Sequence, residues 1–203
     1  MEWWKELGEI SGRLSLLERN IDSGAIVEDL VYIGGAVEIG TGTKVCRGAV
    51  IKGPVLIGKN CLIGNNSMVR GPAVIGDNVL IGFSTEVKNA IIEDEVMIGP
   101  LCFVADSVVR KKAFLGAMVR TSNFMLTKEN VKVLYKEKLV DTGTDKLGAH
   151  IQEGASLGIG VIILPGRTVA QNTIIGPRVI VEKNLKPGRY LLKQELAIES
   201  LKD

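Results

Sequence analysis

The chain has 203 residues, which is enough for one domain with a sizeable core. Its 25 basic and 23 acidic residues leave a formal charge of +2 and form no long block of one sign. This balance indicates neither a nucleic acid nor an anionic membrane as a partner. The first residues lack the apolar core of a signal peptide, and no stretch reaches the roughly 18 apolar residues of a membrane span. We therefore expect a soluble, cytoplasmic protein.

Residues 1–20 are expected to form an N-terminal capping helix. Apolar residues recur here at spacings of three and four, which is typical of an amphipathic helix: Trp3, Leu7, Ile10, Leu14, Leu17 and Ile21. The repeat that follows exposes strand backbone and core at each end, and such ends need a cover. We expect the helix to cover the first coil.

Residues 21–185 carry a six-residue repeat, the strongest signal in the chain. Its aliphatic position is occupied twelve times in succession, at Ile21, Val27, Ile33, Ile39, Val45, Ile51, Ile57, Ile63, Val69, Ile75, Ile81 and Val87. Two shorter hexads, starting at Val87 and Val104, have five residues each. Neither an α-helix nor a lone sheet has this period, so the repeat predicts an all-β solenoid whose aliphatic side chains stack inside.

The repeat is interrupted once and then ends. Residues 121–146 are polar and charged, with a β-like patch at residues 131–135, and we interpret them as an inserted loop. The aliphatic series resumes at Ile151 and continues to Val181. Residues 186–203 are predicted to form a C-terminal tail, helical or irregular.

Three segments make the chain resemble a known family. They are residues 81–89, Leu115-Gly116-Ala117 with Asn123, and Asp141-Thr142-Gly143 with residues 146–149. Together with the hexapeptide repeat, they are similar to the acetyltransferase domain of bifunctional sugar-1-phosphate nucleotidylyltransferase/acetyltransferases of archaea and bacteria. The resemblance covers roughly residues 30–185. It implies a left-handed parallel β-helix, a homotrimer and an acetyl-CoA or other acyl-CoA co-substrate, without a metal.

The resemblance also implies roles for individual residues. Arg70 and Lys88 match the family's phosphate-binding arginine and lysine, Asn123 a loop asparagine and Lys132 a lysine near the sugar. Ala117 matches a position that lines acetyl-CoA. The catalytic histidine of the family is replaced here by Pro100.

A second departure lies beside Pro100. The family's substrate-contacting tyrosine is replaced by Phe103, which has no hydroxyl. Because proline carries no side-chain base, the general base of this chain is not identified by the resemblance.

The register of the repeat supports part of this site without the resemblance. Arg70 and Lys88 are eighteen residues apart, so they should stack on one edge about 4.8 Å apart. Asp106 and Asn123 should continue the same edge. Two stacked cations repel unless an anion lies between them, and a phosphate is one candidate. The alternative is a solvated edge on which Glu86 and Asp106 neutralise the pair.

His150 is the only histidine and a weak candidate for the missing base. It should point outward, and the simpler interpretation is an ordinary surface histidine. One histidine excludes a three-histidine zinc site. Cys61 and Cys102 take inward positions and should be inert, whereas Cys46 follows Val45 at a corner and is expected to be exposed.

Outward positions of the repeat are unexpectedly apolar: Val50, Leu56, Leu62, Met68, Val74 and Leu80. A monomer rarely displays so much contiguous apolar surface, so a cyclic homo-oligomer is predicted.

Three functions remain open at this point. The first is an acyl-CoA-dependent transferase acting on a sugar phosphate or nucleotide sugar. The second is a binding or regulatory protein that keeps the phosphate site without acyl transfer. The third is a structural subunit that partners a separate nucleotidylyltransferase. Retention of the four substrate-side residues favours the enzyme. The sequence does not identify the sugar or the acyl group.

Overall fold

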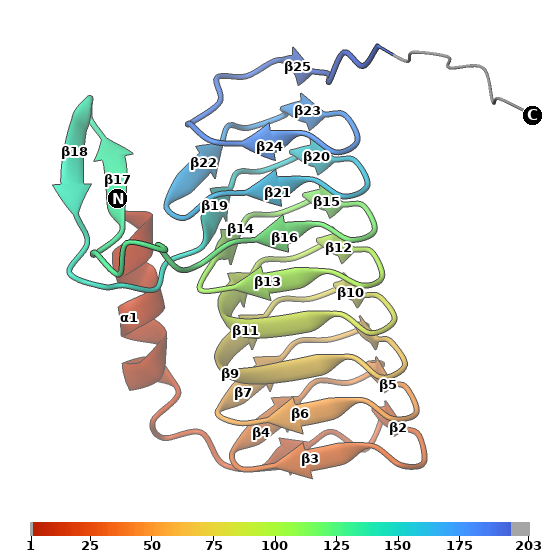
Figure 1. Ribbon diagram of the computed structural model, residues 1–203. Helices are drawn as coiled ribbons and strands as arrows, with labels where there is room; N and C mark the ends of the chain where they lie inside the picture. The colour runs from red at the N-terminus through yellow and green to blue at the C-terminus, as the bar shows by residue number, and fades with distance from the viewer. Residues whose placement is uncertain (1, 196–203) are drawn as a thin grey trace, which may run out of the picture.

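The computed structural model describes residues 2–195, which form a three-sided parallel β-solenoid with one helix along its side (Figure 1). Each coil contributes one strand to each side. We call the sides face 1, face 2 and face 3. Within one coil, residues 50–52 lie on face 1, residues 55–57 on face 3 and residues 62–63 on face 2.

Face 1 consists of β3 (Tyr32–Gly34), β6 (Val50–Lys52), β13 (Phe103–Ala105), β16 (Arg120–Thr121), β21 (Ile162–Ile163) and β24 (Ile180–Val181). Face 2 consists of β2 (Ile26–Val27), β5 (Lys44–Val45), β8 (Leu62–Ile63), β10 (Leu80–Ile81), β12 (Met97–Ile98), β15 (Phe114–Leu115), β20 (Ser156–Leu157), β23 (Ile174–Ile175) and β25 (Arg189–Tyr190). Face 3 consists of β1 (Asn20–Ile21), β4 (Val37–Ile39), β7 (Val55–Ile57), β14 (Val108–Val109), β19 (Ala149–Ile151) and β22 (Arg167–Val169). Two long strands cross from face 1 to face 3, namely β9 (Met68–Ile75) and β11 (Glu86–Ile92).

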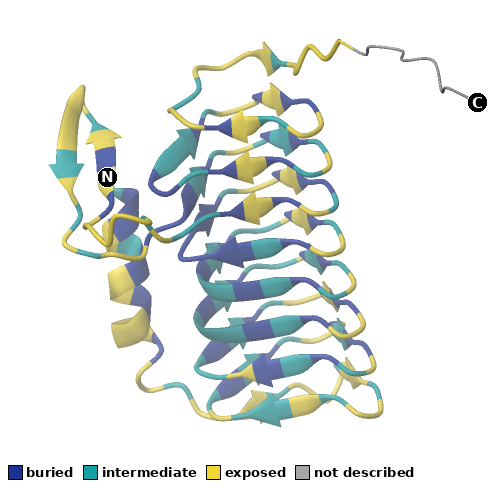
Figure 2. Ribbon diagram, viewed as in Figure 1, coloured by how far each residue is buried: buried dark blue, intermediate teal, exposed yellow. Residues whose placement is uncertain are grey.

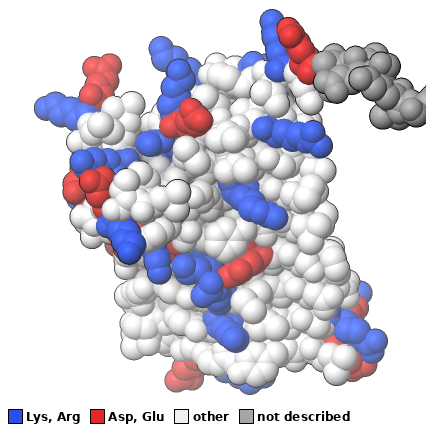
Figure 3. All heavy atoms as spheres, in the orientation of Figure 1, with Lys and Arg blue, Asp and Glu red and all other residues white. Residues whose placement is uncertain are grey.

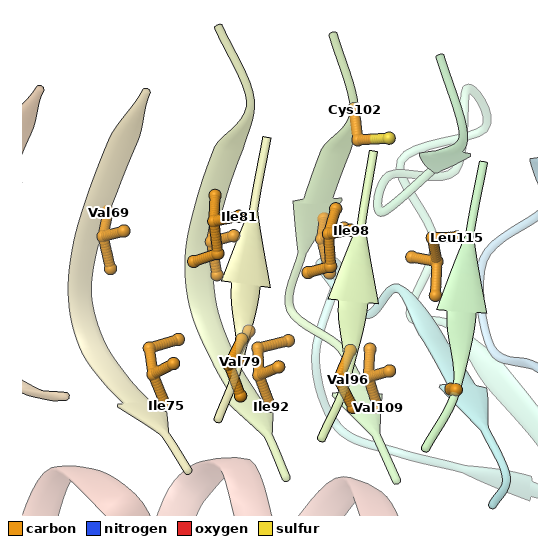
Figure 4. Close-up of a cluster of buried hydrophobic side chains, with 14 of the residues drawn as sticks. Val69, Ile75, Val79, Ile81, Ile92, Val96, Ile98, Cys102, Val109 and Leu115 are labelled. Atoms are coloured by element: carbon orange, nitrogen blue, oxygen red, sulfur yellow. The ribbon is translucent and has the colours of Figure 1, made fainter. Parts of the chain in front are cut away.

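The predicted hexad register is confirmed by the strand pairing. Ile63 pairs with Ile81 eighteen residues later, whereas Ile81 pairs with Ile98 after only seventeen, as the five-residue hexad at Val87 requires. The register shift lies between Lys88 and Ala90 in β11. The aliphatic side chains point into the solenoid and contact one another from coil to coil (Figure 4). From Val37 to Val181 the aliphatic positions are almost fully buried (Figure 2).

The inserted loop leaves the solenoid between face 1 and face 3. Strand β16 ends at Thr121 on face 1, and β19 begins at Ala149 on face 3. Between them lies an antiparallel hairpin of β17 (Lys132–Tyr135) and β18 (Lys138–Asp141). The β-like patch predicted at residues 131–135 therefore forms a strand, and the hairpin stands beside the solenoid (Figure 1).

Helix α1 (Trp3–Arg13) is shorter than the predicted 1–20 and does not cap the first coil. It lies against β9, β11 and β14 on face 3, in the middle of the solenoid (Figure 1). The reason is its apolar face, which is complementary to outward apolar residues of face 3 and to the loop. The contacting cluster contains Trp3, Trp4, Leu7, Ile10, Val108, Val131, Val133 and Leu147.

The first coil consequently remains open in the described part of the chain. Its inward Val27 is 40% exposed, and Ile26, Leu30 and Tyr32 are more exposed still. At the other end the coil continues past residues 186–188, because β25 pairs with β23. The predicted tail is thus strand-like at Arg189–Tyr190, and its residues 196–203 lie outside the described residues. No helix within residues 2–195 is long and apolar enough to cross a membrane.

Candidate functional site

Three cations stack on the corner between face 1 and face 3. Lys52 pairs in register with Arg70, and Arg70 pairs with Lys88, so the neighbours are one strand spacing of about 4.8 Å apart. The predicted stacking of Arg70 and Lys88 is therefore confirmed. Lys52 was missed, although it stands at the same hexad position eighteen residues earlier. Ala105 is the register partner of Lys88 in the next coil, so the row of cations ends at Lys88.

Glycine makes this corner tight. A side chain at Gly71 would place its Cβ 2.1 Å from the carbonyl oxygen of Pro54 in the preceding coil, and one at Gly53 would meet the carbonyl of Ala36 equally closely. Only glycine permits such an approach. The close contact holds successive coils, and with them the cations that precede each glycine, in register.

Two of the three cations have an acidic partner. Arg70 Nε donates to Glu86 Oε1 over 2.7 Å, and Lys88 Nζ lies 3.4 Å from Asp106 Oδ2. Within residues 2–195, Lys52 forms no ion pair and neither Nη atom of Arg70 forms a hydrogen bond. The corner thus keeps a net positive charge and free donors, and basic side chains are visible across this region with acidic ones among them (Figure 3).

Asp106 is the centre of the corner. Its side chain is only 4% exposed. Asn89 Nδ2 donates to Oδ1 over 2.6 Å, and Asn123 Nδ2 and Lys88 donate to Oδ2. The backbone N–H of Gly148 donates to the Asp106 carbonyl. Asp106 therefore joins two coils to both ends of the inserted loop, and the predicted continuation of the edge through Asp106 and Asn123 is confirmed.

A pocket of about 910 Å³ opens beside this carboxylate. Its walls come from α1, from the corner and from the end of the inserted loop: Glu2, Trp4, Lys5, Leu7, Gly8, Glu9, Ser11, Gly71, Pro72, Lys88, Asn89, Asp106, Val140, Asp141, Thr142, Thr144, Lys146 and Leu147. Of the residues expected to bind substrate, only Lys88 lines it. Asn123 does not line the pocket, but it donates a hydrogen bond to Asp106, which does. Arg70 lies on the adjoining edge of face 1.

Lys132 lies apart from this group. It is exposed on β17, where its register partner is Asp141. Asp141 lines the pocket and Lys132 does not.

Ala117, Pro100 and Phe103 lie at the opposite edge of face 1. Pro100 and Ala117 occupy neighbouring coils at the corner between face 2 and face 1, where Met118 N–H donates to the Pro100 carbonyl. Phe103 points outward on face 1, aligned between Glu86 and Arg120. The residues from Phe83 to Lys88 run from one corner to the other, roughly 16 Å at the usual rise of a strand. One chain therefore does not bring the expected acetyl-CoA position next to the stacked cations.

His150 is not an ordinary surface residue. It projects outward from β19 but lies beneath α1, where the Trp3 ring stacks on it with centroids 5.4 Å apart. Arg110 Nε donates to His150 Nε2 over 3.1 Å. Burial, together with the charge of Arg110 and the N-terminus, lowers the pKa of His150 to about 3. The imidazole is therefore neutral at pH 7, and its accepting nitrogen is already occupied.

The three cysteines offer no activated thiol. Cys61 and Cys102 point inward as predicted, and burial raises the pKa of both thiols. The expected exposure of Cys46 is wrong, since only 8% of it is accessible and burial raises its pKa as well. A raised pKa keeps a thiol protonated and unreactive.

Comparison with known proteins defines the class. The chain resembles the UDP-N-acetylglucosamine O-acyltransferase LpxA from Moraxella catarrhalis RH4, with a TM-score of 0.62 at 17% identity, over 82% of this chain and 66% of that one. The fold is accordingly the left-handed parallel β-helix. Residues 51–142 match the GMPPB C-terminal domain. The class that these likenesses define is that of left-handed β-helix proteins.

A relative identifies the family within this class. The acetyltransferase YaiX of Escherichia coli K12 is 51% identical over 203 residues, covering 96% of this chain and 88% of YaiX. The chain belongs to the YaiX family of acetyltransferases, and it is an acyl-transferring enzyme. The bifunctional sugar-1-phosphate nucleotidylyltransferase/acetyltransferase of Sulfurisphaera tokodaii is 36% identical over 107 residues, which cover 53% of this chain and 27% of that enzyme.

Proposed function

We propose that the enzyme transfers an acyl group, in the first instance acetyl, from acyl-CoA to an amine or hydroxyl of a sugar phosphate or nucleotide sugar. The observation that carries this proposal is the row of Lys52, Arg70 and Lys88 beside a pocket. The names of its relatives agree with it, because YaiX is named an acetyltransferase and the Sulfurisphaera enzyme is named for sugar 1-phosphates.

A phosphate would offset the repulsion between the three cations more completely than Glu86 and Asp106 do. Two unit charges 4.8 Å apart repel by about 1–4 kcal/mol between the dielectric of water and that of a protein surface. Glu86 and Asp106 offset part of this repulsion for Arg70 and Lys88 but leave one positive charge in excess. A phosphate dianion would offset the rest and could accept two parallel hydrogen bonds from the free Nη atoms of Arg70.

Acyl transfer needs an attack by the acceptor on the thioester, and the corner that carries Pro100 supplies no base. His150 does not replace it, because its Nε2 accepts from Arg110 and its pKa of about 3 makes it a poor proton acceptor at neutral pH. We therefore propose that orientation of the two substrates supplies most of the rate. Acetylation of glucosamine 1-phosphate should be slow. Pro100→His with Phe103→Tyr should raise it by about 10²-fold or more if a base is what is missing.

The test is an acetyl-CoA assay with sugar phosphates and nucleotide sugars, read by mass spectrometry of the acylated product. Lys52→Gln with Arg70→Gln removes the two most exposed cations and leaves Lys88 to neutralise the buried Asp106. We expect KM for the acceptor to rise at least about tenfold, since charge-assisted hydrogen bonds are worth roughly 1.5–3 kcal/mol each.

The control is Lys183→Ala with Arg189→Ala, which removes one exposed lysine and one exposed arginine several coils beyond Lys88, at the C-terminal end of the solenoid. It should change nothing. An unchanged acceptor KM in the Lys52/Arg70 variant would contradict the phosphate site. A rapid wild-type turnover of glucosamine 1-phosphate would contradict the proposed role of Pro100.

A further inference from the structure

The pocket beside Asp106 is built largely from parts that do not belong to the repeat. Seven of its lining residues come from residues 2–11, and six come from the end of the inserted loop, residues 140–147. The repeat contributes only one corner, at residues 71–72, 88–89 and 106. Within this chain alone, a helix and a loop thus turn the cation-bearing edge into a pocket that stays open to solvent on one side.

The walls combine apolar and polar side chains. The apolar part consists of Trp4, Leu7, Pro72, Val140 and Leu147, and the rim consists of hydroxyl, amide and charged groups. Lys5 and Asp106 already have charged partners, whereas Lys146 forms no ion pair in the described part of the chain. Short hydroxyl and amide side chains beside apolar surface suit a ligand that has hydroxyl groups on a carbon ring, because both kinds of surface then find a partner.

The helix that forms one wall is held firmly. Arg110 joins it to the solenoid, with Nη2 donating to Glu6 Oε1 over 2.7 Å and Nη1 donating to Glu93 Oε1 over 2.8 Å. Trp4 also packs edge-on against the Tyr135 ring of the hairpin, with centroids 5.6 Å apart. The helix, the hairpin and the coils are therefore fixed relative to one another, and a ligand need not order the walls when it binds.

We propose that this pocket binds the sugar ring of a phosphorylated acceptor, with the phosphate against Lys88 and the row of cations, and that α1 determines which sugars fit. The assignment rests on the proposed function for its phosphate. The volume of about 910 Å³ lies at the upper end of the roughly 300–1,000 Å³ typical of small-molecule sites, which leaves room for a sugar with substituents.

Gly8 allows a sharp test. It lines the pocket, and a Cβ added there would meet nothing within 4 Å, so Gly8→Leu adds bulk to the pocket and its Cβ has free space. The matched control is Gly12→Leu. Gly12 lies in the same helix with the same free space but does not line the pocket. Both changes replace a helical glycine by a better helix former, so both proteins should fold at least as well as the wild type.

Binding is measured by isothermal titration calorimetry, with glucosamine 1-phosphate, UDP-N-acetylglucosamine and inorganic phosphate as probes. We expect Gly8→Leu to weaken binding of the probe that binds the wild type best by about tenfold or more, the effect of one misplaced methylene group in a pocket. Gly12→Leu should match the wild type. Inorganic phosphate should bind all three proteins alike, because the added leucine blocks the sugar and not the cations.

Equal binding by Gly8→Leu and the wild type would overturn the proposal, and so would an equal loss in both variants, since that would trace the effect to helix bulk alone. The outcome is separable from that of the acyl-transfer assay. If the wild type acetylates a sugar phosphate with a KM that Gly8→Leu leaves unchanged, the pocket assignment fails and the function stands. If Gly8→Leu abolishes sugar binding and no acetylation is found, the function fails and the pocket stands.

Discussion

Asp106 is the most constrained residue of the corner, because every acceptor on its side chain has a donor and the carboxylate is almost completely buried. Asp106→Asn should be costly for this reason. An amide would place its own N–H₂ against one of the amides of Asn89 and Asn123, and it would leave the Lys88 ammonium without its counter-charge. We expect a loss of roughly 2–3 kcal/mol in the free energy of unfolding.

Urea denaturation followed by circular dichroism measures this loss. Asp141→Asn is the matched control, because Asp141 is an exposed carboxylate on the rim of the same pocket and only accepts a hydrogen bond from the Gly143 N–H, which an asparagine can also do. Equal stabilities for the two variants would show that the buried network is not a support of the corner.

Single residues could be predicted from the sequence where counting along the repeat was sufficient. A spacing of eighteen residues placed Arg70 beside Lys88, and the two short hexads placed Asp106 beyond them. The same counting would have found Lys52, eighteen residues before Arg70. The environment of His150 could not be found in this way, because it depends on Trp3 and Arg110 from distant parts of the chain.

At the scale of elements, the attachment of α1 should depend on pH through His150. The pKa of His150 lies near 3 when the helix is docked and near 6.5 when it is not, so only the undocked or unfolded state takes up a proton between these values. The stabilisation is therefore complete above about pH 6.5 and is lost as the pH falls. Between about pH 7.5 and 5 the loss should reach at most about 2 kcal/mol.

Tryptophan fluorescence reports on this event alone, because both tryptophans of the chain lie in α1. The thermal transition seen by their emission should move to lower temperature as the pH is lowered from about 7.5 to 5. His150→Gln keeps an acceptor for Arg110 and takes up no proton, so its transition should hardly move. Glu6, Glu93 and Arg110 face His150 in both proteins and cancel in the comparison. The same pH dependence in both would rule out His150 as the cause.

The helix itself could be predicted from its apolar spacing, but its position could not. Periodicity shows that one face of residues 3–14 is apolar, and it does not show which surface that face will cover. Face 3 and the inserted loop compete with the open first coil, and they offer an apolar surface together with the Arg110–Glu6 ion pair. The pocket was missed for the same reason, since two of its three walls come from this docking.

At the scale of the whole molecule, the six-residue period was enough to predict the solenoid, because each inward side chain stacks on its own copies and leaves little choice of register. The repeat determines less clearly which surfaces of the solenoid associate with other chains. Of the outward apolar residues, Val74 is partly covered by α1 of the same chain. Others stay accessible, and further apolar side chains on face 2 are exposed, including Met97, Phe114 and Ile174.

We propose that three chains associate through these surfaces and bring the Pro100 edge of one chain towards the cation edge of another. Sedimentation velocity at micromolar concentration should give the mass of a trimer. Met97→Glu with Phe114→Glu, on exposed positions of face 2, should shift the protein towards monomers if face 2 is the contact. If Phe103→Glu shifts it towards monomers instead, the contact is face 1. A stable wild-type monomer would contradict the proposal.

The contacts of α1 have a consequence for the order of folding. Outside the inserted loop, hydrogen bonds between neighbouring coils join residues 14 to 19 positions apart, whereas Arg110 lies 104 positions after Glu6. The helix is synthesised before the strands on which it docks, and its docking surface is complete only when the strand with His150 has been made, roughly 7–30 s later at usual rates of synthesis. Until then the part of its apolar face that packs against the inserted loop and His150 lacks its native partners and is exposed to chaperones and to other nascent chains. The helix thus settles well after its own synthesis, and the pocket comes into existence only when the inserted loop has been translated.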